Sequence, residues 1–280
     1  MAGSRSPFDD PIPRGYDVVL ATLRIAVAIL CWGSAGARLA SGSDFGLGEH
    51  LVQAFHFSQS STDALLDNIA WGLTVSGLLT LVRPCWPVLV PVTLWFATLA
   101  CVGIVDDSYR LQPVTQAIRY LAPLSLLVLD LWPPACKFSL GRAMVGLFFL
   151  RLGIVVTMAG EGLLALQQSR SGGPLADQLG RALEQVFHWS GSSEQVQTVL
   201  GVIGGVYVGL ALGLLLVRSR AIALLITAVA AFGAMSYVVG QGSPAWPQSL
   251  LHASISGAAF TLFLYWWRAV KEQPAITVPA

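Results

Sequence analysis

The chain is poor in charged residues. Only 11% of its 280 residues are Asp, Glu, Lys or Arg, whereas 55% are hydrophobic. A soluble domain carries about 25% charged residues because its surface must be solvated, so the composition excludes an ordinary soluble domain. The formal net charge of +1 also excludes the basic stripe by which proteins bind nucleic acid. We therefore expect a lipid bilayer, and no nucleic acid, as the partner of most of the surface.

The residue patterns of familiar catalytic sites are also missing. The four cysteines contain no CxxC pair, which excludes the usual signature of membrane thiol–disulfide exchange. The sequence has no phosphate-binding loop, zinc-ligand spacing or nucleophile elbow, and its four histidines form no compact ligand set. It therefore predicts no metal site and no catalytic residue. Whether the chain is an enzyme stays open, and a non-catalytic role is favoured.

Long apolar runs dominate what is present. A helix needs about 20 apolar residues to cross a bilayer core, and eight runs approach this length: 17–40, 68–82, 86–105, 116–133, 143–166, 197–217, 221–240 and 249–268. They predict an all-α polytopic membrane bundle of about eight transmembrane helices. The polar segments 1–16 and 271–280 are expected to be disordered tails. More basic residues flank the spans on the side of the two tails, nine against five. This bias places both termini in the cytoplasm, and we expect a bacterial inner membrane.

A repeated motif divides the chain into halves. Residues 53–61, QAFHFSQSS, recur at 185–193 as QVFHWSGSS, with six identities in nine positions. We therefore predict two four-helix repeats, 17–136 and 137–270. Because each would contain an even number of spans, both would have the same topology and be related by an axis along the membrane normal. Further matched pairs flank the motif: Leu23-Arg24 with Leu150-Arg151, and Gln116 with Gln248.

An amphipathic helix is predicted between the first two spans of each repeat. Apolar residues recur there at helical spacing, and Pro174 can open the helix of the second repeat. Phe57 and Trp189 follow these helices and favour a position in the membrane interface. His56 and His188 occupy equivalent positions of the repeated motif. Two neutral imidazoles can bind haem or a metal, but their aromatic neighbours favour interfacial anchoring.

Several features recur in both halves: a Leu-Arg pair early in the first span, glycines further along it (Gly33 and Gly36; Gly160 and Gly162), an interfacial segment before the second span, and a basic loop after it (Arg83; Arg218-Ser219-Arg220). Together they resemble the DoxX-like membrane proteins, a broad family of small four-helix units, and the resemblance covers nearly the whole chain as two copies. It implies a helical-bundle architecture. Some members of that family are linked to quinone-dependent sulfur oxidation, so it also implies a quinone as the cofactor to consider.

Ionisable residues within apolar spans are candidate functional residues. Arg24 and Arg151 are repeat equivalents that can extend to the headgroups or bind a lipid phosphate or a carboxylate. Asp130, near the end of the fourth span, is the expected ion-pair partner of Arg24. Glu161 lies between two glycines, and His252 would reach it if the fifth and eighth spans pack together. Such a pair could relay protons or bind a quinone head group, whereas the alternative is a carboxylate simply solvated at the interface.

Three functions are consistent with these patterns. The leading hypothesis is an accessory or structural subunit that binds other membrane subunits. The second is a quinone-interacting oxidoreductase subunit, with Glu161 and His252 near the head group. The third is a small-molecule transporter that uses the space between the repeats, although the scarcity of polar residues in the spans argues against a polar solute.

Overall fold

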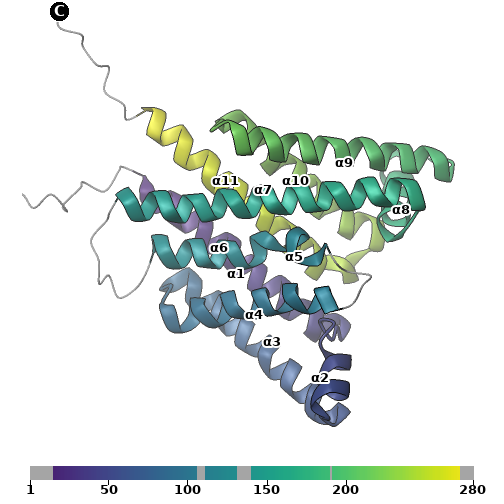
Figure 1. Ribbon diagram of the computed structural model, residues 1–280, viewed down its shortest axis with the longest axis horizontal. Helices are drawn as coiled ribbons and strands as arrows, with labels where there is room; N and C mark the ends of the chain where they lie inside the picture. Colours follow the sequence, from purple (N-terminus) through teal and green to yellow (C-terminus); the bar gives the residue numbers. More distant parts are fainter. Residues whose placement is uncertain (1–14, 106–110, 131–139, 190, 272–280) are drawn as a thin grey trace, which may run out of the picture.

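The fold is entirely helical over the part of the chain that the computed structural model describes, residues 15–105, 111–130, 140–189 and 191–271 (Figure 1). Its elements are α1 (Tyr16–Ser41), α2 (Gly48–Phe55), α3 (Gln59–Val82), α4 (Trp86–Val105), α5 (Gln112–Thr115), α6 (Ala117–Leu129), α7 (Leu140–Ser171), α8 (Pro174–Phe187), α9 (Ser193–Leu216), α10 (Arg220–Gln241), the short 3-10 helix η2 (Ser243–Ala245) and α11 (Trp246–Lys271). The predicted tails lie almost wholly outside the described residues, as does Cys136.

Six of these helices are long and apolar enough to cross a membrane: α1, α3, α7, α9, α10 and α11. By length and composition the chain is therefore an integral membrane protein, and eight spans stay a prediction. In the fourth expected span, 116–133, the described helix is α6, and a turn at Gln116 separates it from α5, which has Pro113 in its first turn. With 13 residues, α6 is about 20 Å long, which is shorter than a hydrocarbon core of about 30 Å.

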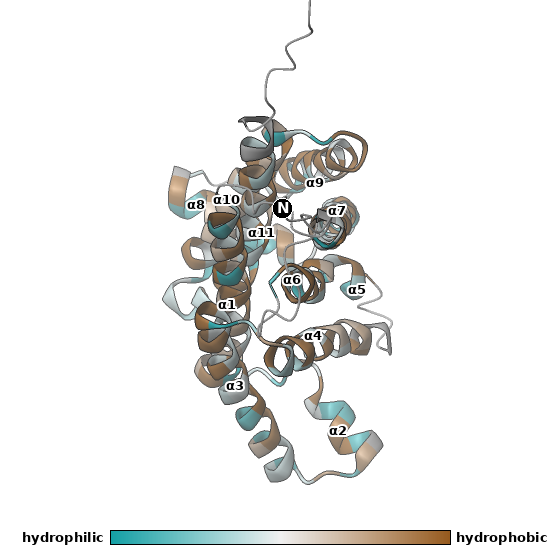
Figure 2. Cartoon of the chain, turned by 90° about the vertical axis from the view of Figure 1, so that its left-hand side faces the viewer, coloured by the Kyte–Doolittle hydropathy of each residue, from teal (hydrophilic) through white to brown (hydrophobic). Residues whose placement is uncertain are grey.

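The long helices form two layers, visible in Figure 2. In one layer the neighbours are α3, α1, α11 and α10; in the other they are α4, α6, α7 and α9. Contacts between neighbours within a layer are far more extensive than contacts between the layers. Each layer contains helices from both halves of the sequence, because α1 packs on α11 and α6 packs on α7. The halves are therefore interlocked rather than set beside one another as separate bundles.

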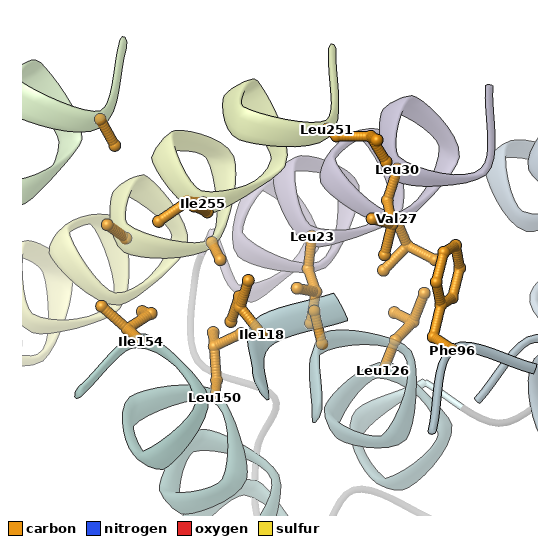
Figure 3. Close-up of a cluster of buried hydrophobic side chains, with 14 of the residues drawn as sticks. Leu23, Val27, Leu30, Phe96, Ile118, Leu126, Leu150, Ile154, Leu251 and Ile255 are labelled. Atoms are coloured by element: carbon orange, nitrogen blue, oxygen red, sulfur yellow. The ribbon is translucent and has the colours of Figure 1, made fainter. Parts of the chain in front are cut away.

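The apolar core lies between the layers. Figure 3 shows Leu23 and Val27 of α1 pointing towards Leu126 of α6, and Leu150 of α7 close to Ile118. Leu23, Leu126 and Leu150 are fully buried. Large apolar side chains on the outer helices, such as Trp71 on α3 and Phe232 on α10, are exposed, as expected where lipid rather than water surrounds the helices.

Burial follows the same spacing in the two halves. In α1 the buried residues include Leu23, Val27 and Cys31, and in α7 they include Leu150, Ile154 and Met158, which are 150 − 23 = 127 residues later in each case. In α3 and α9, likewise, the buried residues Thr62 and Val196 are 196 − 62 = 134 residues apart, as are Leu66 and Leu200 and also Thr80 and Leu214. Corresponding helices therefore turn the same face to the core.

Glycine allows the helices of each layer to approach closely. A Cβ atom on Gly160 would lie 2.9 Å from the backbone nitrogen of Thr115, and one on Gly33 would lie 2.9 Å from that of Leu251. Both distances are shorter than any normal carbon–nitrogen contact, so a side chain at either position would push α7 from α5, or α1 from α11. These two glycines are 160 − 33 = 127 residues apart and hold equivalent helix contacts.

Helices α2 and α8 lie at the end of the bundle opposite the described chain ends (Figure 1). Both end at a histidine with left-handed backbone geometry: φ is 56° at His56 and 52° at His188. The backbone N–H of His56 bonds to the carbonyl oxygen of Leu51, and that of His188 to the carbonyl oxygen of Leu183. This is a C-terminal helix cap of the αL type. The repeated motif therefore ends one helix and leads into the next.

Candidate functional site

A cavity of about 1040 Å³ lies between the layers, at the end of the bundle that carries α2 and α5. Its walls come from both layers, with α1 and α11 on one side and α4 to α7 on the other, and the segment 43–46 borders it. The cavity is partly open to the outside. Its size suits a small organic molecule, since ligand pockets commonly measure about 300–1,000 Å³.

Amide side chains give this cavity its polar character. Five glutamines line it, from the three helices α5, α7 and α11 and from the turn between α5 and α6: Gln112, Gln116, Gln167, Gln168 and Gln248. Ser34, Thr115 and His50 add further donors and acceptors. The side-chain oxygen of Gln168 already accepts the backbone N–H of Leu175, 2.9 Å away, at the start of α8. The polar residues are few in the sequence, but the fold gathers them in one place, so the expected argument against a polar solute does not hold for this cavity.

Arg119 supplies positive charge to the cavity wall. It lies in the first turn of α6, immediately after the turn at Gln116 that separates α5 from α6. Its guanidinium interacts electrostatically with Glu161 and Tyr237. Within the described part of the chain, that guanidinium has no hydrogen-bond or ion-pair partner. An unpaired cation in a membrane span is costly, so Arg119 is the strongest ligand-binding candidate in the structure.

Glu161 and His252 are brought together across the layers. The Nδ1 atom of His252 on α11 lies 3.6 Å from Oε1 of Glu161 on α7, and both side chains are mostly buried. The ring of Tyr237 stacks on the imidazole with 4.4 Å between ring centroids. Tyr207 of α9 also interacts electrostatically with Glu161. Neither Glu161 nor His252 lines the cavity, but Arg119 faces both the pair and the cavity.

The position of Glu161 follows from its neighbouring glycines. Gly160 allows α7 to touch α5, and a Cβ atom on Gly162 would lie 2.8 Å from the carbonyl oxygen of Gly204 on α9. With helices that close on two sides, the Glu161 side chain is directed towards α10 and α11. Its counterpart 127 residues earlier is Ser34, which lines the cavity. The two halves therefore place different chemistry at one equivalent position.

The structure also brings Arg24 and Asp130 together. Nε of Arg24 lies 2.5 Å from Oδ2 of Asp130, which follows the last turn of α6, so the contact links the two layers. Arg151 makes a different contact, donating hydrogen bonds of 2.6 to 2.8 Å to the carbonyl oxygens of Leu214 and Leu215 at the end of α9. Basic side chains commonly satisfy the last carbonyls of a helix in this way. Arg24 and Arg151 therefore both have partners within the protein and do not need a lipid phosphate to satisfy them.

His56 and His188 are exposed, and neither belongs to the cavity or to the Glu161–His252 pair. Their backbone role as helix caps accounts for their place in the repeated motif. Within the described residues, no group of three or more His, Cys, Asp or Glu side chains could hold a metal ion. The arrangement therefore gives no support for paired-histidine haem ligation.

Sequence reasoning missed Arg119 and the role of the glutamines. In the sequence, Arg119 is an ordinary basic residue at the start of an apolar run. The one available signal was the match between Gln116 and Gln248, and both of these side chains line the cavity. No family model, curated protein or solved structure matches this chain, so nothing in these comparisons names a DoxX-like family.

Proposed function

We propose that this chain is a small-molecule transporter that takes a polar molecule into the cavity between its two layers. The observation that carries this proposal is a large, partly open cavity lined by glutamine side chains and by Arg119, for which the described residues supply no hydrogen-bond or ion-pair partner. Polar and charged groups at membrane depth mark substrate pathways when they face a water-filled cavity. A purely structural subunit has no need to gather such groups in one place.

The architecture we propose for this function is a DoxX-like tandem of two four-helix repeats with eight spans and both termini in the cytoplasm. The equal spacing of buried residues in α1 and α7, and in α3 and α9, supports the repeat. Many transporters are built from repeats that are related by an axis along the membrane normal, with the substrate between the repeats. In this orientation, the end that carries α2 and α8 faces outward, and the cavity opens on that side.

The opposite end of the interlayer space is closed. Leu23, Leu126 and Leu150 fill it, and the Arg24–Asp130 contact bridges the layers beyond them. Because the helices of one layer approach each other more closely than the two layers do, each layer can act as a unit, and a relative movement of the two layers would close one end and open the other. Alternating access in repeat-built transporters commonly uses such rigid-body movement.

Uptake by the purified protein in proteoliposomes tests the proposal. The assay uses a panel of isotopically labelled carboxylates, amides and sugars, and we expect at least one to accumulate. Ala37→Phe would fill the cavity wall, since Ala37 is buried and lines the cavity, and it should abolish this uptake. Leu39→Phe is the matched control, because Leu39 is on the same helix but exposed. Equal uptake by Ala37→Phe and wild type would contradict the proposal.

An accessory role in a larger membrane complex is the second candidate. The observation in its favour is the exposed face of α9, where Val202 and Val206 are exposed and Gly205 and Gly209 have open space before them. Small residues allow close packing of a partner helix. Co-purification of a stoichiometric membrane subunit, together with absence of uptake by the isolated chain, would favour this function. A quinone recovered with the protein would instead direct attention to Glu161 and His252.

A further inference from the structure

We infer that the molecule bound in the cavity is an anion, a carboxylate or phosphate that pairs with Arg119, and that Glu161 competes with it for this arginine. The inference rests on the proposed function and names its substrate class. It also has a consequence for coupling: when the anion binds Arg119, Glu161 loses a compensating charge and takes up a proton from water. One anion and one proton would then enter the site together.

Arg119 presents its positive charge to the cavity. Its guanidinium lies in the cavity wall, and among the described residues it makes no hydrogen bond and no ion pair. A guanidinium offers five N–H donors in a planar fork that matches a carboxylate or phosphate. In a partly enclosed cavity such a charge-assisted pair is stronger than a hydrogen bond to a neutral group, so an anion in the cavity would satisfy Arg119 better than a neutral molecule does.

The cavity wall around Arg119 is suited to the remainder of such a ligand. Gln116 and Gln248 contribute amide groups from opposite layers, and Thr115 contributes a hydroxyl group. Asp44 is the one carboxylate among the described lining residues, and its Oδ1 atom accepts the backbone N–H of Gly46 at 3.0 Å. Asp44 belongs to the segment between α1 and α2 at the border of the cavity, whereas Arg119 belongs to the first turn of α6. The two side chains thus come from different parts of the cavity wall.

Glu161 is surrounded by ionisable groups. From the elements packed near it, the ionisable groups that face it are Arg119 of α6, Tyr207 of α9, Tyr237 of α10 and His252 of α11. Arg119 is the permanent cation in this set. A negative charge on Glu161 is therefore stabilised by Arg119 while the cavity is empty, and much less once a bound anion has neutralised that arginine. Protonation of Glu161 and anion binding should strengthen each other.

The experiment measures binding to the purified chain by calorimetry in a neutral detergent. Its probes are matched pairs that differ in charge: benzoate and benzamide, lactate and lactamide, succinate and succinamide, with inorganic phosphate added. We expect at least one anion to bind, at least tenfold more tightly than its amide, and more tightly at pH 6 than at pH 8. Titration in buffers of different ionisation enthalpy should reveal uptake of about one proton per anion bound.

Variants separate the roles of the two residues. Arg119→Gln should weaken anion binding at least tenfold and Arg119→Lys less, whereas Arg181→Gln on the exposed side of α8 should have no effect. Glu161→Gln should tighten anion binding at pH 8 and remove its pH dependence. A gain of affinity cannot arise from misfolding, so this variant keeps the inference testable even if Arg119 variants are unstable.

The outcomes distinguish this inference from the proposed function. Uptake of a neutral probe in proteoliposomes, together with equal binding of amides and carboxylates, would overturn the anion inference and leave the transporter proposal standing. Failure of every anion to bind would also overturn it. If anionic phospholipid displaces the soluble probe from the wild-type protein, and Arg119→Gln weakens the binding of that phospholipid, the anion is a lipid headgroup. If phospholipid does not displace the probe, the anion is a free solute.

Discussion

The two halves of the molecule share a plan and differ at the end that holds the cavity. In the second half, α8 has 14 residues and crosses from one layer to the other: it packs on α9 through Ala176 and on α10 where Gly240 meets Ala182. In the first half, α2 has only eight residues and packs mainly on α3. The half whose layers are bridged holds the Glu161–His252 pair, whereas most of the residues that line the cavity come from the half whose layers are not bridged.

The chemistry under these two helices differs in the same way. Arg38 of α1 is buried and forms ion pairs with Asp63 at 3.0 Å and Asp67 at 2.7 Å on α3. The residue 127 positions after Arg38 is Ala165, which belongs to the apolar cluster that α8 covers. The longer helix α8 thus covers an apolar cluster, whereas the shorter helix α2 lies near the ion pairs of Arg38, whose carboxylate partners are exposed. These differences place a cavity beside α2 and an apolar cluster beneath α8.

The largest effect is expected from Gly160→Val in the contact between α7 and α5. The new side chain would meet backbone atoms of α5, which cannot move aside as a side chain can, so we expect a loss of about 3 kcal/mol or more in unfolding free energy. Gly205→Val on α9 is the control, because no atom lies within 4 Å of its Cβ position. Thermal unfolding in detergent measures both, and similar melting temperatures for the two variants would contradict the close helix approach.

Arg38→Gln should have the next largest effect. Arg38 is buried and hydrogen-bonds to two carboxylates and to the backbone oxygen of Asp63. Hydrogen bonds to charged groups contribute about 1.5–3 kcal/mol, and we expect a loss of unfolding free energy towards the upper end of that range. Ala165→Gln in the second half is a useful comparison, since it would place a polar group in the apolar cluster under α8. If Arg38→Gln left stability unchanged, the ion-pair cluster would not be needed to hold α1 on α3.

The contact between Arg24 and Asp130 should contribute less, because Arg24 is 29% exposed. We expect Arg24→Gln to cost about 1.5 kcal/mol and Arg151→Gln to cost less, since Arg151 pairs only with backbone oxygens at a helix end. The double exchange of Arg24 to Asp and Asp130 to Arg should recover part of the lost stability. A double variant less stable than either single variant would show that no direct pair forms.

Thr157→Val tests the break between α5 and α6 and should have the smallest effect on stability. The hydroxyl oxygen of Thr157 accepts the backbone N–H of Ile118 at 2.8 Å, which the turn at Gln116 leaves without a helical partner. Removing it leaves a buried donor unsatisfied, at a cost of about 1 kcal/mol or somewhat more. In Thr93→Val, the control, the lost hydroxyl bonds only to its own helix. Equal melting temperatures for both variants would contradict this role for Thr157.

Much of the helical framework could be predicted from the sequence, because apolar runs of sufficient length leave little alternative to helices in lipid. A helix lies within each predicted span, although the turn between α5 and α6, at the start of the run 116–133, is stabilised by Thr157 of another helix. The interlocking of the layers could not be predicted, since periodicity reports which face is apolar and not which helix covers it. The Glu161–His252 proximity was expected only on the condition that α7 and α11 pack together.

The cavity was beyond sequence reasoning for a different reason. Its glutamines are spread from Gln112 to Gln248 with no regular spacing, so only the fold brings them together. In the sequence, Arg119 is indistinguishable from an ordinary basic residue at the edge of a span. Its place in the cavity wall follows from the turn at Gln116, which no sequence pattern predicted. A polar site assembled from distant, unpatterned residues leaves almost no signal in a single sequence.

The difference between the halves is tested most directly by hydrogen–deuterium exchange of the wild-type protein in lipid nanodiscs, comparing amides of α2 with those of α8. Amide exchange reports how readily a helix opens locally. Because α8 is held by both layers and α2 mainly by α3, we predict that amides of residues 174–187 exchange at least tenfold more slowly than those of 48–55. Equal exchange in the two helices, or slower exchange in α2, would contradict the account of a closed second half and an open first half.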